Sequence, residues 1–216
     1  EPGIGKSTIV LQSAGIISLN EKVLYITAEE SLEQVKIRWE RLDQSSLDLK
    51  IYAETNLSLI IEEIKKIKPS FAIIDSIQAI NNDEMESASG SVSQVRSCSS
   101  ELQNLAKENN IALLIIGHVT KEGALAGPKT LEHLVDVVLN FEGDNISSHR
   151  LLRSVKNRFG STFEIGIFEM LENGLKEVGN PSSIFTNKEN ISGVTTTITN
   201  EGSRPFAVDI QALVNK

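Results

Sequence analysis

Short apolar runs alternate with amphipathic segments through the first 140 residues of the chain. The runs Val23–Thr27, Phe71–Asp75 and Ile111–Gly117 are nearly continuous in apolar residues. Strands that are buried on both faces of a parallel sheet have this composition, because helices cover both sides of such a sheet. We therefore predict that these segments are strands of one parallel sheet.

Helices are predicted between the strands, because apolar residues there recur at helical spacing. Ser31 stands where it can N-cap the first of these helices. The residues predicted to share one face are Val35, Trp39 and Leu42 in the first helix, Ile60, Ile64 and Ile67 in the second, and Val95, Cys98, Leu102 and Leu105 in the third. Alternating strands and helices predict an α/β fold with a doubly wound, mostly parallel sheet.

The pattern changes in the second part of the chain. Arg150–Lys156 and Phe163–Met170 are predicted to be antiparallel strands that extend the sheet. The segment from about Lys176 has the composition of a linker. Beyond it, Gly193–Thr199 and Phe206–Val214 indicate two elements of a further domain that this chain does not complete.

Two polar segments, Ala79–Val92 and His118–Thr130, are longer than ordinary connections in a compact domain. Loops of roughly a dozen residues without secondary structure are usually functional or disordered. We therefore expect both segments to take part in function.

Composition limits the location and the partners. The net charge of −8 argues against coating of nucleic acid by bulk electrostatic attraction, although it is compatible with a local basic channel. The one cysteine, Cys98, cannot form an internal disulfide, and we interpret it as a small buried residue in a reducing, cytoplasmic setting. No run approaches about 18 apolar residues, so no transmembrane helix is predicted.

The chain opens with EPGIGKST, which fits the phosphate-binding motif G-x-x-x-x-G-K-S/T if its first glycine precedes residue 1. The glycines let backbone N–H groups face the phosphates, and a helix at Ile9–Ile17 would present its positive end to them. Lys6 would reach the β- and γ-phosphates of ATP, and the Ser7 hydroxyl would bind Mg²⁺. The residues predicted to contact the nucleotide are Gly3, Ile4, Gly5, Lys6, Ser7 and Thr8. The apolar helix argues against the alternative, a chance GKS turn.

Acidic residues follow two of the predicted strands. Asp75 ends one of them, where it can hold Mg²⁺ through water, although it could also cap a turn. Glu29 and Glu30 follow Val23–Thr27, where a carboxylate can polarise the water that attacks the γ-phosphate. Glu29 is our choice of general base and Glu30 the second choice; the alternative is a solvated pair that opens the next helix.

Three further residues are candidates for sensing or stabilising the γ-phosphate. His118 follows the strand Ile111–Gly117 and could sense it, or could be an ordinary loop histidine. Lys156 and Arg158 point to the same side of an extended chain. Offered to the ATP of a neighbouring subunit, they would neutralise transition-state charge as an arginine finger does. From the residues alone, a solvated basic strand end is the better interpretation.

Several segments together carry a family resemblance: EPGIGKST, AEES, IIDSIQ, GSVSQVR, IGHVTKEG, AGPKTLEHLVD, KNRFG and EIGIFEM. On these segments the chain resembles the bacterial RadA (Sms) family of DNA repair proteins, which are RecA-like P-loop ATPases, along essentially its whole length. KNRFG together with GHVTKEG and AGPK-x-LEH is highly specific, whereas a phosphate-binding loop alone is not.

The resemblance implies an ATP hydrolase that single-stranded DNA stimulates. Such a protein assembles as a hexameric ring, drives branch migration of recombination intermediates and works with a recombinase of the RecA type. By position, the resemblance assigns Lys6, Ser7 and Asp75 to the nucleotide site and Glu29 to catalysis.

The same resemblance implies where DNA is bound. Lys156 and Arg158 lie in KNRFG, which favours a role in trans or toward DNA over a solvated strand end. The segment His118–Thr130 matches a DNA-facing loop, so Lys121 and Lys129 are expected to contact phosphates.

The chain departs from the family at both ends. The four-cysteine module of the family is absent, so we expect Zn²⁺ only outside this chain, and the strand before the phosphate loop is absent too. PFAVDIQALV resembles the beginning of a Lon-protease-like domain. We expect a RecA-like ATPase domain over residues 1–178, a linker and the truncated start of the Lon-like domain over residues 179–216, and an incomplete nucleotide site that leaves the fragment inactive.

Alternatives to a motor stay open. One is a nucleotide-switched scaffold that binds DNA or a recombinase and hydrolyses ATP only to reset. Another is a small-molecule P-loop kinase, against which the missing substrate lid and KNRFG count. The place of the first long loop is also open, because Asp83, Glu84 and Glu86 would repel a phosphate backbone. That loop contacts bases or protein, or it lies away from DNA.

Overall fold

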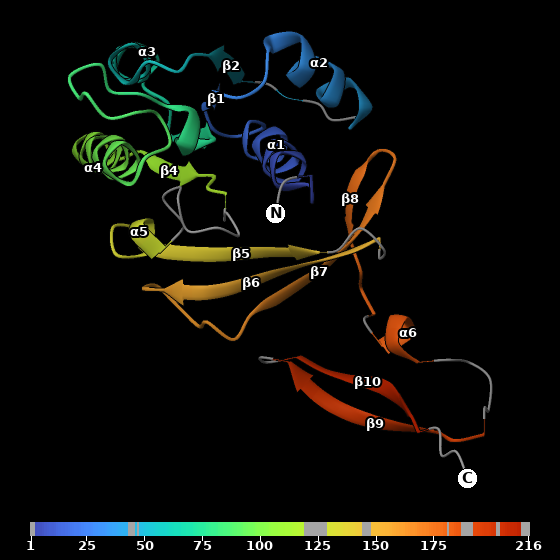
Figure 1. Cartoon of the computed structure of the whole chain (residues 1–216). Coiled ribbons are helices and arrows are strands. Elements are labelled where there is room, and N and C mark those ends of the chain that lie inside the picture. Colours follow the sequence, from blue (N-terminus) through green and yellow to red (C-terminus); the bar gives the residue numbers. More distant parts are fainter. Residues whose placement is uncertain are drawn as a thin grey trace. The chain divides into compact units, whose positions relative to one another are not determined.

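The computed structural model describes residues 3–42, 46, 48–118, 129–143, 148–180, 182–186, 192–201 and 204–212. The chain divides into two units, Glu1–Val135 with Glu172–Gly174, and Asp136–Leu171 with Leu175–Lys216. Figure 1 shows the elements of both, coloured along the sequence.

The first unit contains a parallel sheet of four strands in the order β2-β1-β3-β4. Its strands are β1 Val23–Thr27, β2 Leu49–Ala53, β3 Phe71–Asp75 and β4 Ala112–Ile115. Its helices are α1 Lys6–Ile17, α2 Leu32–Arg41, α3 Leu57–Ile67, α4 Val92–Glu108 and α5 Lys129–Glu132, with the 3₁₀ helix η1 Ile77–Ala79. The three predicted strands are confirmed as β1, β3 and β4.

Helices pack on both faces of this sheet (Figure 1). On one face, Tyr25 and Ile73 lie in a buried cluster with Leu11 of α1 and Val35 of α2. On the other face, the buried cluster contains Leu24, Ile26 and Ile74 from the strands, Ile60 from α3, and Val95 and Cys98 from α4. Successive side chains of a strand point to opposite faces, so one apolar run supplies both clusters. The predicted α/β fold is confirmed.

The apolar faces predicted for α2, α3 and α4 are the buried ones. Val35, Leu42, Ile60, Ile64, Val95, Cys98, Leu102 and Leu105 are buried, and Trp39 and Ile67 are partly buried. The predicted N-cap is also confirmed, because Ser31 Oγ accepts a hydrogen bond from Gln34 N (3.3 Å) and Gln34 Oε1 accepts one from Ser31 N (2.9 Å). This capping box satisfies two backbone N–H groups near the start of α2.

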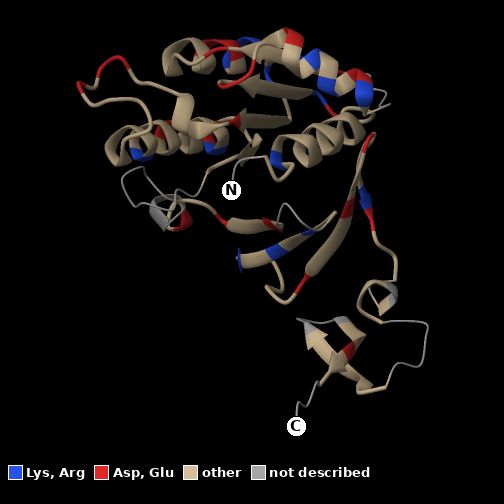
Figure 2. Cartoon of the chain, turned by 45° about the vertical axis from the view of Figure 1, so that its right-hand side comes forward, with Lys and Arg blue, Asp and Glu red and all other residues tan. Residues whose placement is uncertain are grey.

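The first long loop is held against α4 by buried amides. Gln94 Oε1 accepts from Asn82 N (3.0 Å), and Gln94 Nε2 donates to the carbonyl oxygens of Asn82 (3.1 Å) and Ser87 (2.8 Å). Asn82 Nδ2 in turn donates to Glu101 Oε1 (3.0 Å). The loop is therefore a folded segment, and Figure 2 shows acidic residues, in red, along it.

A second sheet, in the order β5-β6-β7-β8, lies mainly in the second unit. Its strands are β5 Val137–Gly143, β6 His149–Asn157, β7 Ile165–Leu171 and β8 Gly174–Glu177. The segments predicted as antiparallel strands are β6 and β7, which pair antiparallel. They do not continue the parallel sheet, which corrects that part of the expectation. The physical reason is that β6 pairs along its length with β5, its hairpin neighbour, with Phe141 opposite Leu152.

The two elements expected in the tail form an antiparallel hairpin of β9 Val194–Glu201 and β10 Arg204–Gln211. The short helix α6 Ser182–Phe185 packs on it, with the rings of Phe185 and Phe206 stacked at a centroid distance of 5.4 Å. The domain boundary at residues 178 and 179 and the Lon-like character of the tail stay predictions. Throughout the part of the chain that the structure describes, no helix is both long and apolar enough to span a bilayer.

Candidate nucleotide-binding site

The parallel strands deliver polar residues to one edge of the first unit. Thr27 lies opposite Asp75, so β1 and β3 end at the same level. Glu29 comes soon after β1, and His118 comes soon after β4. Ligands bind at the carboxyl edge of the strands in open α/β sheets. The predicted polar residues of the first unit therefore lie at the edge of the sheet where a ligand is expected to bind.

The phosphate loop turns tightly into α1. Gly3 and Gly5 have φ values of 76° and 102°, in the left-handed region that favours glycine. Gly5 is the N-cap of α1, so Lys6, Ser7 and Thr8 form the first turn. The N–H groups of a first turn have no partner within the helix and form its positive end. This loop thus has the local form that the motif predicts, and Ile4 within it is buried.

Lys6, in the first turn of α1, is within electrostatic range of two carboxylates. Its half-buried position lowers the pKa of the ammonium group, while the negative charges of Asp75 and Glu29 act to raise it. These opposing effects show that the cation at the start of α1 feels both acidic residues. A cation beside two carboxylates at a helix start is suited to a ligand that carries phosphates and a divalent metal ion.

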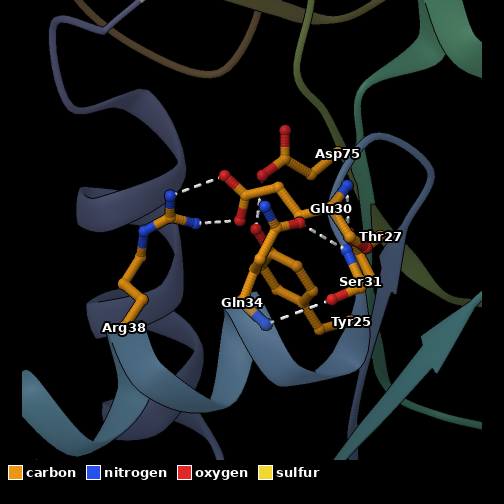
Figure 3. Close-up of polar contacts among 7 residues, drawn as sticks. All are labelled: Tyr25, Thr27, Glu30, Ser31, Gln34, Arg38 and Asp75. Carbon is orange, nitrogen blue, oxygen red and sulfur yellow. Dashed lines mark hydrogen bonds and ion pairs between the residues drawn. The ribbon is translucent and has the colours of Figure 1, made fainter.

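Asp75 is tied to the neighbouring strand. Tyr25 Oη donates a hydrogen bond to Asp75 Oδ2, and both residues are buried (Figure 3). Burial raises the pKa of the Tyr25 hydroxyl strongly, and the charge of Asp75 raises it further. The hydroxyl therefore stays a protonated donor to the carboxylate across the physiological range of pH.

Glu29 is approached by two side chains from other strand ends. Ser76 Oγ donates to Glu29 Oε1, and His118 Nε2 lies 3.5 Å from the same oxygen. Burial lowers the pKa of His118, Lys6 lowers it further, and Glu29 and Asp75 oppose this change. Gln78 Nε2 holds the carbonyl oxygen of His118 at 3.2 Å.

Glu30 faces in a different direction from its neighbour in sequence. Its carboxylate forms a two-pronged ion pair with Arg38 of α2, with 2.6 Å between Arg38 Nη2 and Glu30 Oε1 (Figure 3). Its backbone is also fixed, because Thr27 Oγ1 donates to the Glu30 carbonyl oxygen at 2.8 Å. The structure thus brings Glu29 together with Lys6 and His118, and it turns Glu30 toward α2.

The predicted cations of the KNRFG segment lie in the second unit, at the end of β6. Arg158 pairs there with Asp136, with 2.9 Å between Nη1 and Oδ1. Lys156 is part of β6 and is partly buried. Lys121 and the side chain of Lys129 lie outside the described residues.

Curated proteins match the whole chain. It is 56% identical over 218 residues to the DNA repair protein RadA of Listeria monocytogenes serovar 1/2a, a match that covers 100% of this chain and 48% of that protein. It is 52% identical over 216 residues to RadA of Streptococcus pneumoniae, which covers 99% of this chain and 51% of that protein. The resemblance to RadA is confirmed. The chain spans about half the length of these relatives, and a scan of protein-family models found no match.

Solved structures show which fold this RadA-like chain has. A KaiC-like protein from Pyrococcus horikoshii OT3 superposes with a TM-score of 0.61 at 16% identity, over 82% of this chain and 85% of that chain. The RadB recombinase superposes with a TM-score of 0.57 at 21% identity, over 81% of this chain and 86% of that chain. At these identities the likeness shows the fold alone. The chain has the α/β fold that these two proteins share.

Sequence reasoning missed several residues that hold the candidate site together: Tyr25 on Asp75, Ser76 on Glu29, Arg38 on Glu30 and Gln78 on His118. A signal for the first was present, because Tyr25 interrupts an otherwise aliphatic stretch of a buried strand. A buried hydroxyl needs a hydrogen-bond partner. The partner itself lies 50 residues away along the chain, so its identity depends on the strand register.

Proposed function

We propose that this RadA-like chain is the ATPase part of a DNA repair protein and hydrolyses MgATP at the carboxyl edge of its parallel sheet. The observation that supports this most is geometric: Lys6 begins α1 directly after the phosphate loop, and Asp75 and Glu29 stand at the carboxyl ends of the paired strands β3 and β1. The resemblance to RadA and the RecA-like fold favour the same activity.

The residues at this edge fit a nucleotide with a divalent cation. Among the residues that the structure describes, a Cβ atom added to Gly3 would have no heavy atom within 4 Å apart from its chain neighbours, so that side of the loop has room for a ligand. Lys6 and the N–H groups of the first turn of α1 would hold the phosphates. The Ser7 hydroxyl and the Asp75 carboxylate would hold Mg²⁺, which prefers oxygen ligands. The bound ion would neutralise negative charge on the phosphates.

Glu29 is the residue that we propose as general base. A carboxylate within reach of the attacking water takes its proton as the new bond to the γ-phosphorus forms and the bond from that phosphorus to the bridging oxygen breaks, with ADP as the leaving group. Ser76 and His118 both approach Oε1 of this carboxylate and would orient it. His118 also stands immediately before residues 119–128, so we propose that it senses the γ-phosphate and links the site to that segment.

We also propose that this ATPase acts on DNA. The proposed role comprises a hexameric ring on single-stranded DNA, branch migration of recombination intermediates, cooperation with a RecA-type recombinase, and a cytoplasmic location. Lys121 and Lys129 would contact DNA phosphates, and Lys156 and Arg158 would act across subunits or on DNA. The resemblance to RadA supports these roles.

Binding and hydrolysis of ATP by the full-length protein test the nucleotide site. Lys6→Ala should abolish Mg²⁺-dependent ATP binding, because the cation that neutralises the phosphates is lost. Lys65→Ala, which removes an exposed lysine of α3, is the matched control and should behave as the wild type. Equal ATP binding by Lys6→Ala and the wild type would refute the assigned site.

A further inference from the structure

The hydroxyl of Tyr25 is an unusual polar atom at the centre of the parallel sheet. Every residue of β1 is buried, and Tyr25 is 0% exposed. It belongs to a buried cluster whose other members are apolar: Leu11, Ala14, Val23, Val35, Leu42 and Ile73. A phenylalanine would fill this space without burying a hydroxyl, so packing alone does not account for the tyrosine.

The strand register aims this hydroxyl at Asp75. Thr27 lies opposite Asp75 in the parallel pairing of β1 with β3. Tyr25 is two positions before Thr27, and residues two apart in a strand share a face. The ring therefore runs along the face that carries Asp75, and its hydroxyl reaches Oδ2 of that carboxylate (Figure 3). Asp75 is itself only 6% exposed.

We propose that Tyr25 is a positioning residue for the metal site: its hydroxyl holds Oδ2 of Asp75 and thereby orients the carboxylate for Mg²⁺. This inference rests on the proposed function, because it assumes that Asp75 serves the cation of MgATP. Groups that hydrogen-bond to metal-site carboxylates fix the orientation of the ligand and tune its affinity for the metal. Tyr25 acts through Asp75 and does not touch the nucleotide.

The test is the Mg²⁺ dependence of nucleotide binding by the full-length protein. A fluorescent, non-hydrolysable ATP analogue reports binding without any turnover. Tyr25→Phe should raise the Mg²⁺ concentration needed for half-maximal binding by about tenfold. It should leave binding without Mg²⁺ unchanged, because the phosphate loop is intact. If Tyr25 had only a packing role, the substitution would not change the Mg²⁺ requirement while leaving Mg²⁺-free binding as it was.

Tyr52→Phe is the matched control. This substitution also removes a tyrosine hydroxyl, but from β2, the adjacent strand of the same sheet. It should leave the Mg²⁺ requirement as in the wild type. If Tyr25→Phe shifts the Mg²⁺ requirement no more than this control does, the inference is wrong. If the wild type shows no Mg²⁺-dependent binding at all, the proposed function fails, and this inference fails with it.

The double variant Tyr25→Phe with Asp75→Asn gives an independent check. If Tyr25 acts only through Asp75, the double variant should need the same Mg²⁺ concentration as Asp75→Asn alone, because coupled residues are not additive. The double variant is also useful if Tyr25→Phe alone unfolds. In that single variant the buried carboxylate of Asp75 loses its hydrogen-bond donor, whereas in the double variant an uncharged amide replaces the carboxylate. A further shift of severalfold in the double variant would contradict the proposal.

Discussion

Glu29 and Glu30 are adjacent in the chain but have different neighbours. The first accepts from Ser76 and lies near His118, whereas the second is held by Arg38 of α2. The choice between two acidic residues is therefore made by which of them turns back toward the ends of β3 and β4. Sequence alone suggests an order of preference between the two residues. It does not show which carboxylate faces the phosphates, because both follow the same strand.

Glu29→Gln should lower the rate of ATP hydrolysis about 10²- to 10⁴-fold while ATP still binds, because the amide cannot accept the proton of water. Glu30→Gln should keep most of the hydrolysis rate, because its carboxylate faces Arg38. Steady-state hydrolysis and equilibrium ATP binding of the two variants decide this. A greater loss of hydrolysis in Glu30→Gln than in Glu29→Gln would reverse the assignment.

Cys98 should be unreactive in the folded protein. It is buried on α4, and burial is the main effect that raises the pKa of its thiol to about 11. At pH 8 the group is therefore protonated, and the thiolate that attacks alkylating agents is scarce. Iodoacetamide labelling followed by peptide mapping should find Cys98 unmodified until denaturant is added. Rapid modification of Cys98 in the native protein would show that this part of the core is open.

At the scale of elements, the parallel strands are the most predictable part of the fold. β1, β3 and β4 are continuous apolar runs because helices cover both of their faces. β2 was missed because its sequence mixes apolar with polar residues such as Lys50, and its residues are only partly buried or exposed. β5 was missed for a similar reason, since its burial alternates only partly along Val137–Gly143.

The first long loop is a case in which composition gave an incomplete view. Its polar residues mark it as a functional or disordered segment, yet hydrogen bonds of buried amides hold it against α4. Asn82 and Gln94 bury their amides and satisfy each other and the backbone. The acidic residues of the loop are thus carried by a fixed support, which sequence reasoning could not foresee because these contacts span a turn of irregular backbone.

Gln94→Ala should destabilise the first unit by about 1–3 kcal/mol, because it leaves buried groups of Asn82 and Ser87 without their partners. Urea unfolding should show the loss, and limited proteolysis should cut the segment between η1 and α4 earlier. Lys107→Ala, an exposed change near the end of α4, is the control and should change stability little. Equal stability of the two variants would mean that the amides do not hold the loop.

At the scale of the whole molecule, the local order of motifs was more predictable than the arrangement of sheets. The phosphate loop, the end of β3 and the end of β1 meet because a parallel sheet brings its carboxyl ends to one edge. The antiparallel strands instead form a sheet with β5, since hairpin pairing depends on partners that apolar content does not specify. The roles that we propose for Lys156 and Arg158 depend on other subunits or DNA, and no single chain contains those.

We propose above all that this chain carries an ATPase site that serves a process on DNA. The most direct measurement is ATP hydrolysis by the full-length protein with and without single-stranded DNA, compared among the wild type, Lys6→Ala, Arg158→Ala and Arg153→Ala. We predict that DNA stimulates the wild type and the β6 control Arg153→Ala. Lys6→Ala should lose hydrolysis, and Arg158→Ala should bind ATP but lose the stimulation. ATP binding by the wild type without DNA-stimulated turnover would contradict the motor and favour a nucleotide-switched scaffold.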